Sequence, residues 1–341
     1  MKLLRTILFA VFAVWVPAAA VPLDNFGSGL SGGPAQASGF RPLFPDALTW
    51  DGFLSSVRGA SPQIYAVPTK EEADRLRSPA DARLQSFLLN NDVFALYGKP
   101  GAYTMGILGR YPLDEIEEVM DDFVARYDAA NGQRGIIPAF YIIFGTCWPE
   151  GEIGILNSSV VQEYIEFAAE RGWLVFLDHQ IGRYSVESAV EKLLPWLRYD
   201  NVHLALDPEW RTEKPMQEIG SVTAEEINRA QQMIQDYMKE HNLPDRRMLV
   251  IHQFKPKMIQ DREEVRSDFE LVKLIHCADG FGSPQLKRNT YAFNAAAKNI
   301  PLKSFKLFLE PTVEGAGYDQ PLMSPEEVFA LNPRPYLIMY Q

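Results

Sequence analysis

The chain has 341 residues, of which 47% are hydrophobic and 23% charged, and its formal net charge is −11. This composition is typical of a globular protein and excludes collagen-like, coiled-coil and wholly disordered chains. The acidic balance argues against a nucleic-acid binder and against a polybasic membrane-surface protein, because both need a basic face.

Residues 1–20, MKLLRTILFAVFAVWVPAAA, predict a cleaved secretory signal. Lys2 and Arg5 provide the charged start, an apolar run follows, and Ala18 to Ala20 match the small-residue cleavage signature. The alternative is a membrane anchor, but the apolar run is shorter than the roughly 20 residues of a spanning helix. We therefore expect a secreted, periplasmic or cell-envelope protein without a membrane span after cleavage.

Residues 21–92 predict a Gly/Ser/Pro-rich leader and a preamble that packs on the domain that follows. From residue 93 to 341, short apolar runs alternate with amphipathic stretches, as buried parallel strands and covering helices do. The strand candidates are Val93–Tyr97, Ile136–Phe144, Trp173–Asp178, Val202–Asp207, Met248–Gln253, Val272–Asp279, Phe305–Glu310 and Tyr336–Tyr340. Eight such units fit a (β/α)8 TIM barrel, whereas the alternative, an open doubly wound sheet, lacks its Gly-rich phosphate turn.

Helix starts are predicted where a capping side chain precedes an apolar period. The candidates are Ser159 with Gln162, Thr223 with Glu226, Ser283 before Pro284, and Ser324 with Glu327. The two cysteines, Cys147 and Cys277, fall in distant units, so we expect two separate thiols. Two cysteines are also too few for a cysteine-based zinc site.

Polar residues end nearly every predicted strand, on the side where TIM barrels hold their active sites. These residues are Asp178, His179, Gln180, Asp207, Glu209, Trp210, His252, Gln253, Asp279, Glu310 and Tyr340. Trp148 follows the second strand in the loop of residues 145–158 and is a candidate substrate wall. Several carboxylates and two histidines at one rim favour a functional cluster over a solvated edge, because buried carboxylates need a partner or a use.

Asp207 and Glu209 form the most specific signal. Residues two apart on a strand point the same way, so both carboxyl groups are expected to face the barrel mouth. Like charges in a partly dry site raise one pKa, which gives a carboxylic acid beside a carboxylate, the pair that cleaves glycosidic bonds. Trp210 adds an aromatic platform of the kind on which sugar rings stack. The alternative is that Asp207 merely caps the next helix and Glu209 is loop surface.

The segment Leu204–Trp210, LALDPEW, resembles the end of the fourth strand in chitinase-like (family 18) and lysozyme-like (family 25) barrel glycosidases. This resemblance implies that Glu209 is the general acid, that Asp207 is its partner, and that Tyr340 near the last strand's end holds the sugar. The chain departs from the chitinase-like pattern at Val202 and Ala205, where acidic residues are missing, so an N-acetyl sugar is not specified. The whole chain also resembles secreted bacterial TIM-barrel proteins of unassigned activity, which supports the fold.

Two alternatives to a cofactor-free glycosidase remain open. Asp178, His179, His252 and Asp279, with Asp207 and Glu209, offer the ligand types of a metal-dependent hydrolase or phosphodiesterase, although no HxH or HExxH spacing is present. A non-catalytic carbohydrate-binding envelope protein fits the aromatic rim equally well. In each reading Asp178, Trp210, His252, Gln253, Asp279, Glu310, Trp148 and Tyr340 are candidate binding residues.

Two further features are less specific. Lys306 is a candidate Schiff-base lysine if it points inward and is desolvated. The Gly-containing segment 311–323 is a candidate lid over the mouth or a simple linker.

Overall fold

The computed structural model describes residues 90–243 and 245–341. The predicted secretory signal and nearly all of the predicted leader therefore lie outside the described residues. The first strand begins at Asn91, so the barrel starts two residues before the predicted boundary at residue 93. Across the described residues, no helix has both the length and the apolar character needed to cross a membrane.

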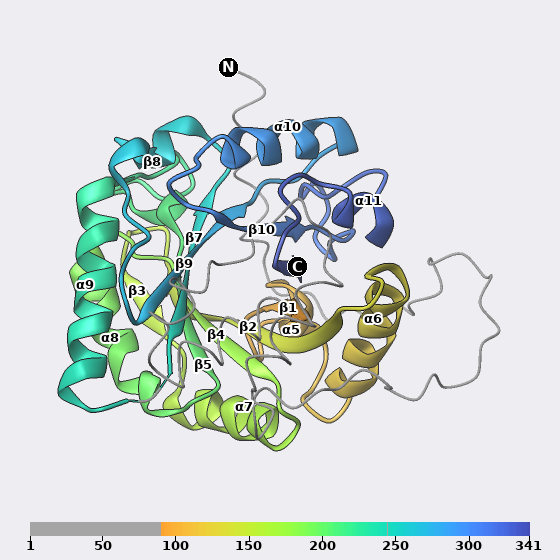
Figure 1. Cartoon of the computed structure of the whole chain (residues 1–341), viewed down its shortest axis with the longest axis horizontal. Helices are drawn as coiled ribbons and strands as arrows, with labels where there is room; N and C mark the ends of the chain where they lie inside the picture. Colours follow the sequence, from red (N-terminus) through yellow and green to blue (C-terminus); the bar gives the residue numbers. More distant parts are fainter. Residues whose placement is uncertain (1–89, 244) are drawn as a thin grey trace, which may run out of the picture.

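Eight parallel strands close into a barrel with helices around it (Figure 1). Their order is β1-β11-β10-β9-β7-β5-β4-β2, and β1 pairs with both β11 and β2, which closes the cylinder and excludes the open doubly wound sheet. Every predicted strand is confirmed, with small shifts of its ends. The strands are β1 (Asn91–Gly98), β2 (Gly135–Cys147), β4 (Leu174–His179), β5 (Val202–Leu206), β7 (Arg247–Gln253), β9 (Val272–Ala278), β10 (Leu302–Leu307) and β11 (Leu337–Tyr340).

The connections carry the helices and three short extra strands. The α-helices are α5 (Ile107–Arg110), α6 (Ile116–Ala130), α7 (Ser158–Glu170), α8 (Val186–Leu193), α9 (Ala224–Glu240), α10 (Pro284–Ala295) and α11 (Pro325–Phe329). The 3-10 helices are η2 (Leu194–Arg198), η3 (Pro208–Trp210), η4 (Pro256–Met258) and η5 (Arg262–Glu264). β3 (Ile153–Ile155) pairs antiparallel with the end of β2, and β6 (Val222–Thr223) pairs with β8 (Ile259–Gln260).

Helix starts follow the capping rules in most cases. Thr223 and Ser324 each form a reciprocal capping box with the glutamate three residues later, as predicted. The predicted cap of α7 at Ser159 is wrong. Asn157 is the N-cap instead, because its side-chain oxygen accepts hydrogen bonds from both the backbone N–H and the hydroxyl of Ser159 at 2.9 Å.

The apolar side chains form two layers. One lies inside the barrel and includes Ala139, Phe176, Val250 and Leu337. The other lies between the strands and the helices and is the larger of the two. Because both faces of each strand are covered, the strands are apolar at almost every position. Where the inner row reaches the carboxyl ends of the strands, its apolar residues give way to polar ones.

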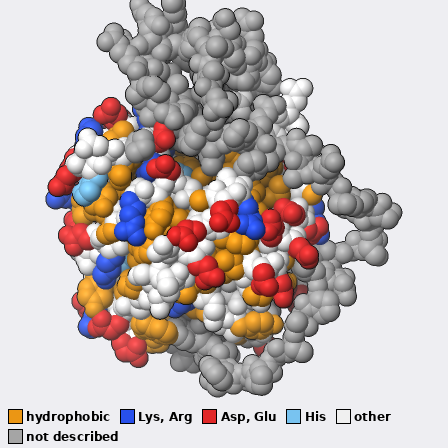
Figure 2. All heavy atoms as spheres, turned by 90° about the horizontal axis from the view of Figure 1, so that it is seen from below, with side chains coloured by type: hydrophobic (Ala, Val, Ile, Leu, Met, Phe, Trp, Pro, Cys, Tyr) orange, Lys and Arg blue, Asp and Glu red, His pale blue; other side chains and the backbone are white. Residues whose placement is uncertain are grey.

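One face of the molecule is mixed in charge (Figure 2). Figure 2 shows one face on which Asp and Glu side chains are scattered among apolar, neutral and basic ones. The two cysteines, Cys147 and Cys277, are both buried free thiols, as predicted.

Candidate active site

An open pocket of about 290 Å³ lies at the carboxyl ends of the strands. Its floor is polar and includes Asp207, Glu209, Asp279 and Lys306. Its walls are largely aromatic and apolar, with Tyr97, Trp210, Phe254, Phe281 and Phe308. An apolar cleft with a few convergent polar groups is the usual form of a small-molecule or sugar site.

The Asp207–Glu209 pair faces this pocket, as the sequence predicts, although the backbone reason differs. β5 ends at Leu206, and Asp207 is the N-cap of η3, so Glu209 lies on a 3-10 turn and not on the strand. One Asp207 side-chain oxygen accepts a hydrogen bond from the Glu209 N–H at 3.2 Å. This hydrogen bond fixes the position of Asp207 relative to Glu209. Asp207 therefore both caps the 3-10 helix and lines the pocket.

Asp279 is the anion that organises the floor. Its Oδ2 lies 2.8 Å from Nδ1 of His252 and 3.3 Å from Nζ of Lys306, and its Oδ1 accepts the Gly280 N–H at 2.7 Å. Burial alone raises a carboxyl pKa, but here Lys306 and the His252 N–H outweigh it and lower the pKa of Asp279. The ionised form of Asp279 is therefore favoured, and it accepts hydrogen bonds from the Lys306 ammonium and the His252 ring.

Two tyrosines extend this network into the barrel. Tyr141 Oη lies 2.6 Å from Nε2 of His252, so both ring nitrogens of the histidine have partners. Tyr97 donates a hydrogen bond to Asp178 Oδ2 at 3.1 Å, and the Lys306 ammonium lies 3.9 Å from the centre of the Tyr97 ring. Asp178 thus lies one layer below the pocket floor.

The pKa values of Asp207 and Glu209 are raised, whereas that of Asp279 is lowered. Burial, together with the charges of Asp178 and Asp279, raises the pKa of Asp207 to about 7. Burial and the charges of Asp207 and Asp279 raise the pKa of Glu209 well above its usual value. The pocket floor therefore combines two carboxyl groups whose pKa values are raised, Asp207 and Glu209, with one whose pKa is lowered, Asp279. Environments that separate carboxyl pKa values in this way are those that create acid and base roles.

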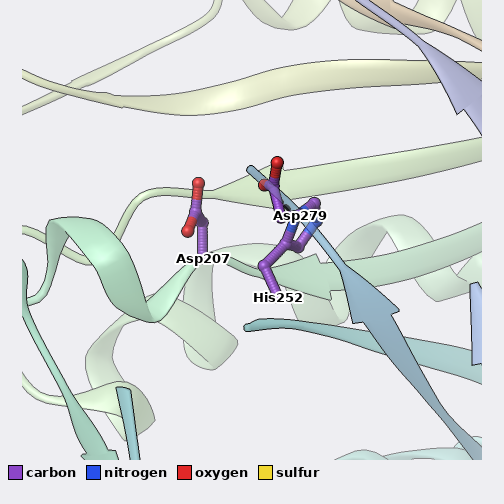
Figure 3. Close-up of side chains that lie close together, drawn as sticks. All are labelled: Asp207, His252 and Asp279. Carbon is purple, nitrogen blue, oxygen red and sulfur yellow. Dashed lines mark hydrogen bonds and ion pairs between the residues drawn. The ribbon is translucent and has the colours of Figure 1, made fainter. Parts of the chain in front are cut away.

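The donor set for a metal ion is partly present. Side-chain atoms of Asp207, His252 and Asp279 lie within 4.8 Å of one another (Figure 3). However, both nitrogens of His252 are already hydrogen-bonded, and the Lys306 ammonium already balances Asp279. A divalent ion would have to compete with that buried ammonium, so the cluster fits an internal ion pair better than a metal site.

The predicted metal ligand His179 points away from this cluster. Strand residues alternate in direction, so Asp178 faces the interior and His179 faces the outer layer. The Ile181 N–H donates to His179 Nδ1 at 2.9 Å, and burial lowers the pKa of His179 to about 3. Gly145 lies against this ring, where a Cβ would be 2.6 Å from Cδ2.

Four other predicted binding residues do not line the pocket. Tyr340 packs in the outer layer, where its hydroxyl is 2.9 Å from that of Tyr127. Gln253 also faces outward and lies 2.8 Å from the His276 ring. Glu310 follows the end of β10 and is solvent-exposed, outside the pocket wall. Trp148 is 41% exposed and lies under the Lys99 ammonium, also outside that wall.

The sequence does not predict the roles of two residues that line the pocket, Lys306 and Arg110. Lys306 is considered there only as a nucleophile, yet its ammonium pairs with Asp279 and the surrounding carboxylates raise its pKa against the effect of burial. A lysine held protonated in this way is a poor nucleophile. Arg110, on α5, also lines the pocket and carries no motif that marks it in the sequence.

Comparisons with known proteins give structural similarity alone. No family model matches the chain, and no curated protein matches it. The chain is similar to a solved family 18 chitinase from Crocus vernus, with a TM-score of 0.42 and 10% identity over 73% of this chain and 92% of that one. It is also similar to an oxaloacetate acetylhydrolase solved with oxalate, with a TM-score of 0.40 and 12% identity over 64% and 71% of the two chains. A third similar structure is a GH138 enzyme targeting pectin rhamnogalacturonan II. Its TM-score is 0.37, with 9% identity over 73% of this chain and 34% of that one.

Proposed function

We propose that this protein is a hydrolase of glycosidic bonds, with Glu209 as the general acid and Asp207 as the carboxylate beside it. The observation that carries the proposal is that both carboxyl groups face one pocket with raised pKa values. A general acid has to hold its proton near neutral pH, and burial next to other carboxylates provides that condition.

In this mechanism the Glu209 carboxylic acid donates its proton to the glycosidic oxygen as the bond to the sugar carbon breaks. The carboxylate left on Glu209 is then stabilised by the Lys306 ammonium, whose charge acts to lower its pKa. Positive charge develops on the sugar ring as the bond breaks, and the ionised form of Asp207 is placed to stabilise it. A water molecule then adds to the sugar carbon and loses a proton to a carboxylate of the pair, which restores the protonation of the site. The aromatic walls, including Trp210 and Phe254, provide stacking surfaces for sugar rings.

The proposal includes export of the protein, with residues 1–20 as the cleaved signal. N-terminal sequencing of protein recovered from the culture medium or envelope fraction is expected to begin at Val21. Recovery of full-length chain from the cytoplasm alone would contradict this part of the proposal.

The catalytic test is reducing-end release from a panel of oligosaccharides and polysaccharides by the purified protein. Glu209→Gln is expected to lower the rate about 10²–10⁴-fold, because general acid catalysis contributes that much. Glu213→Gln is the matched control, since Glu213 is exposed in the loop that follows and lies outside the pocket wall. Equal activity in wild type and Glu209→Gln would overturn the assignment.

The same sample distinguishes the alternatives. Stoichiometric metal with phosphoester turnover that a chelator abolishes would favour the metallohydrolase, with Asp207, His252 and Asp279 as ligands. Saturable sugar binding in the absence of any turnover would favour the non-catalytic carbohydrate-binding reading. Both outcomes would contradict the role given to Glu209.

A further inference from the structure

Arg110 reaches the pocket from the segment that follows β1. This segment folds tightly on itself and on the strand end, with backbone against backbone. At Gly106, where φ is +80°, a Cβ would lie 2.5 Å from the Tyr97 carbonyl oxygen. At Gly109 a Cβ would lie 2.0 Å from the Ala102 carbonyl oxygen. These contacts fix the path of α5, which lies beside β1 (Figure 1). They thereby fix the point from which Arg110 reaches the pocket wall.

The Arg110 guanidinium has no acidic partner within residues 90–243 and 245–341. Its Nε is buried without a hydrogen-bond acceptor, and burial lowers its pKa, with only Tyr103 and Tyr111 acting in the opposite direction. The other buried cations of the pocket are paired, Lys306 with Asp279 and Lys287 with Asp319, each at 3.3 Å. Arg110 is therefore a partly desolvated cation in the pocket wall whose charge the described chain does not balance.

Such a cation favours a ligand that carries negative charge. A guanidinium presents several N–H donors in a plane and binds carboxylate, sulfate or phosphate oxygens in pairs. An anionic group would supply both the missing negative charge and the missing acceptor for Nε. A neutral sugar would supply hydroxyl acceptors only, and these leave the buried charge unbalanced.

The position of Arg110 also separates such an anion from the acidic floor. In the closed barrel, β2 and β4 lie between β1, which precedes Arg110, and β5, which precedes Glu209. A ligand anion held by Arg110 would therefore lie away from Asp207 and Glu209 around the mouth. This arrangement lets one pocket accept a negatively charged ligand without placing its charge against the two carboxyl groups.

We propose that Arg110 binds an anionic group of the substrate, so that the pocket takes a glycan bearing a carboxylate or a sulfate ester. The assignment of the anion as part of a glycan rests on the proposed function. The anion preference itself rests on Arg110 and is measured by binding, which separates its failure from failure of the catalytic proposal.

Binding is measured by calorimetry to Glu209→Gln, in which turnover is expected to be about 10²–10⁴-fold slower. The first ligand pair is a glucuronic-acid-containing oligosaccharide and the same oligosaccharide after reduction of each carboxyl group to an alcohol. The second pair is a sulfated oligosaccharide and its desulfated form. We expect the anionic member of one pair to bind with a Kd at least tenfold lower than that of its neutral counterpart. The pair that shows this difference identifies the anion.

Two further variants, each made in the Glu209→Gln background, locate the effect. Arg110→Gln is expected to remove the preference for the anionic member while leaving the Kd of the neutral member unchanged, and Arg110→Lys to retain part of it. Arg229→Gln is the control, because it removes one exposed positive charge from α9, outside the pocket wall. Thermal unfolding of each variant checks that it is folded.

Equal binding of both members of both pairs by the parent protein would overturn the proposal. An anion preference that survives in Arg110→Gln, or that is lost equally in Arg229→Gln, would also overturn it, because the charge responsible would then lie elsewhere. Anion preference without glycosidic turnover in protein with Glu209 intact would support the role of Arg110 and contradict the proposed function.

Discussion

The Nδ1 atom of His252 lies 2.8 Å from Oδ2 of Asp279, and both side chains are almost completely buried. The same oxygen lies 3.3 Å from the Lys306 ammonium. One carboxylate thus contacts both the His252 ring and the Lys306 ammonium at the bottom of the pocket. Because ionised groups are costly to bury unless they are paired, the loss of this one anion is expected to have a large effect.

Asp279→Asn is expected to lower the free energy of unfolding by about 3–5 kcal/mol, because it leaves the buried Lys306 ammonium without its partner. Urea denaturation of wild type and variant measures the change.

Lys306→Met in the Asp279→Asn background serves as the second arm of this test. Removing the orphaned charge is expected to recover part of the lost stability, so the double variant should be more stable than Asp279→Asn. If the two substitutions instead add their costs, the ion pair does not account for the stability of the floor.

The contribution of Asp207 to the stability of the folded state is expected to fall as pH rises from about 4 to about 7. Asp207 has a folded-state pKa of about 7, against an ordinary value of 3.8, so the folded state binds more protons than the unfolded state across that interval. The raised pKa of His252 acts in the same direction, since its stabilising effect is present at low pH and is lost as pH rises through the folded value.

Asp207→Asn isolates the first of these contributions, because the amide cannot ionise. The stability of this variant relative to wild type is expected to improve by about 2–4 kcal/mol between pH 4 and pH 8. Denaturant midpoints at four pH values provide the measurement, with the exposed Asp114→Asn as control. A constant difference between wild type and Asp207→Asn would contradict the raised pKa.

The rate of hydrolysis is expected to fall on the alkaline side, where Glu209 loses its proton. The negative charge of Asp207 contributes to the raised pKa of Glu209. In the residual activity of Asp207→Asn, the alkaline limb should therefore move to lower pH. A profile of kcat/KM against pH measures this, and an unmoved limb would show that the two groups do not interact.

Tyr340→Phe tests the placement of this residue behind the barrel wall. The variant loses the buried hydrogen bond to Tyr127, so we expect a destabilisation of about 1 kcal/mol. Sugar binding and kcat should stay unchanged, because the side chain does not face the pocket. A rise in KM without loss of stability would restore the predicted role of Tyr340 in holding the sugar.

The sequence was sufficient to predict the barrel and to place Asp207 and Glu209 at its mouth. Long apolar runs at regular spacing mark buried strands, and the order of the chain then determines which ends meet. The inward or outward direction of each side chain is harder to predict, because strands that are buried on both faces lack polar alternation. Tyr340 and Gln253 were misplaced for this reason, since nothing in their apolar surroundings distinguishes the two faces.

The ion pair between Lys306 and Asp279 at the pocket floor could not be predicted from the sequence either. Lys306 meets Asp279 only because β9 and β10 are neighbours in register, and its flanking residues Phe305 and Leu307 do not indicate that contact. The residues next to Arg110 in the sequence form no motif that marks it as a pocket residue. Its role depends on which charges are absent from its surroundings, which only a folded structure reveals.

The close backbone contacts at Gly106 and Gly109 limit how this pocket can diversify. A methyl group at either position would push the segment away from Tyr97 or Ala102, and Arg110 would move with it. Changes in ligand preference are therefore expected from exchange of the arginine itself or from other lining segments, such as those around Met216, Phe254 and Pro311. The part of the pocket wall formed by residues 106–110 is therefore held by backbone contacts. Adaptation to a new ligand is expected in the other parts of the lining.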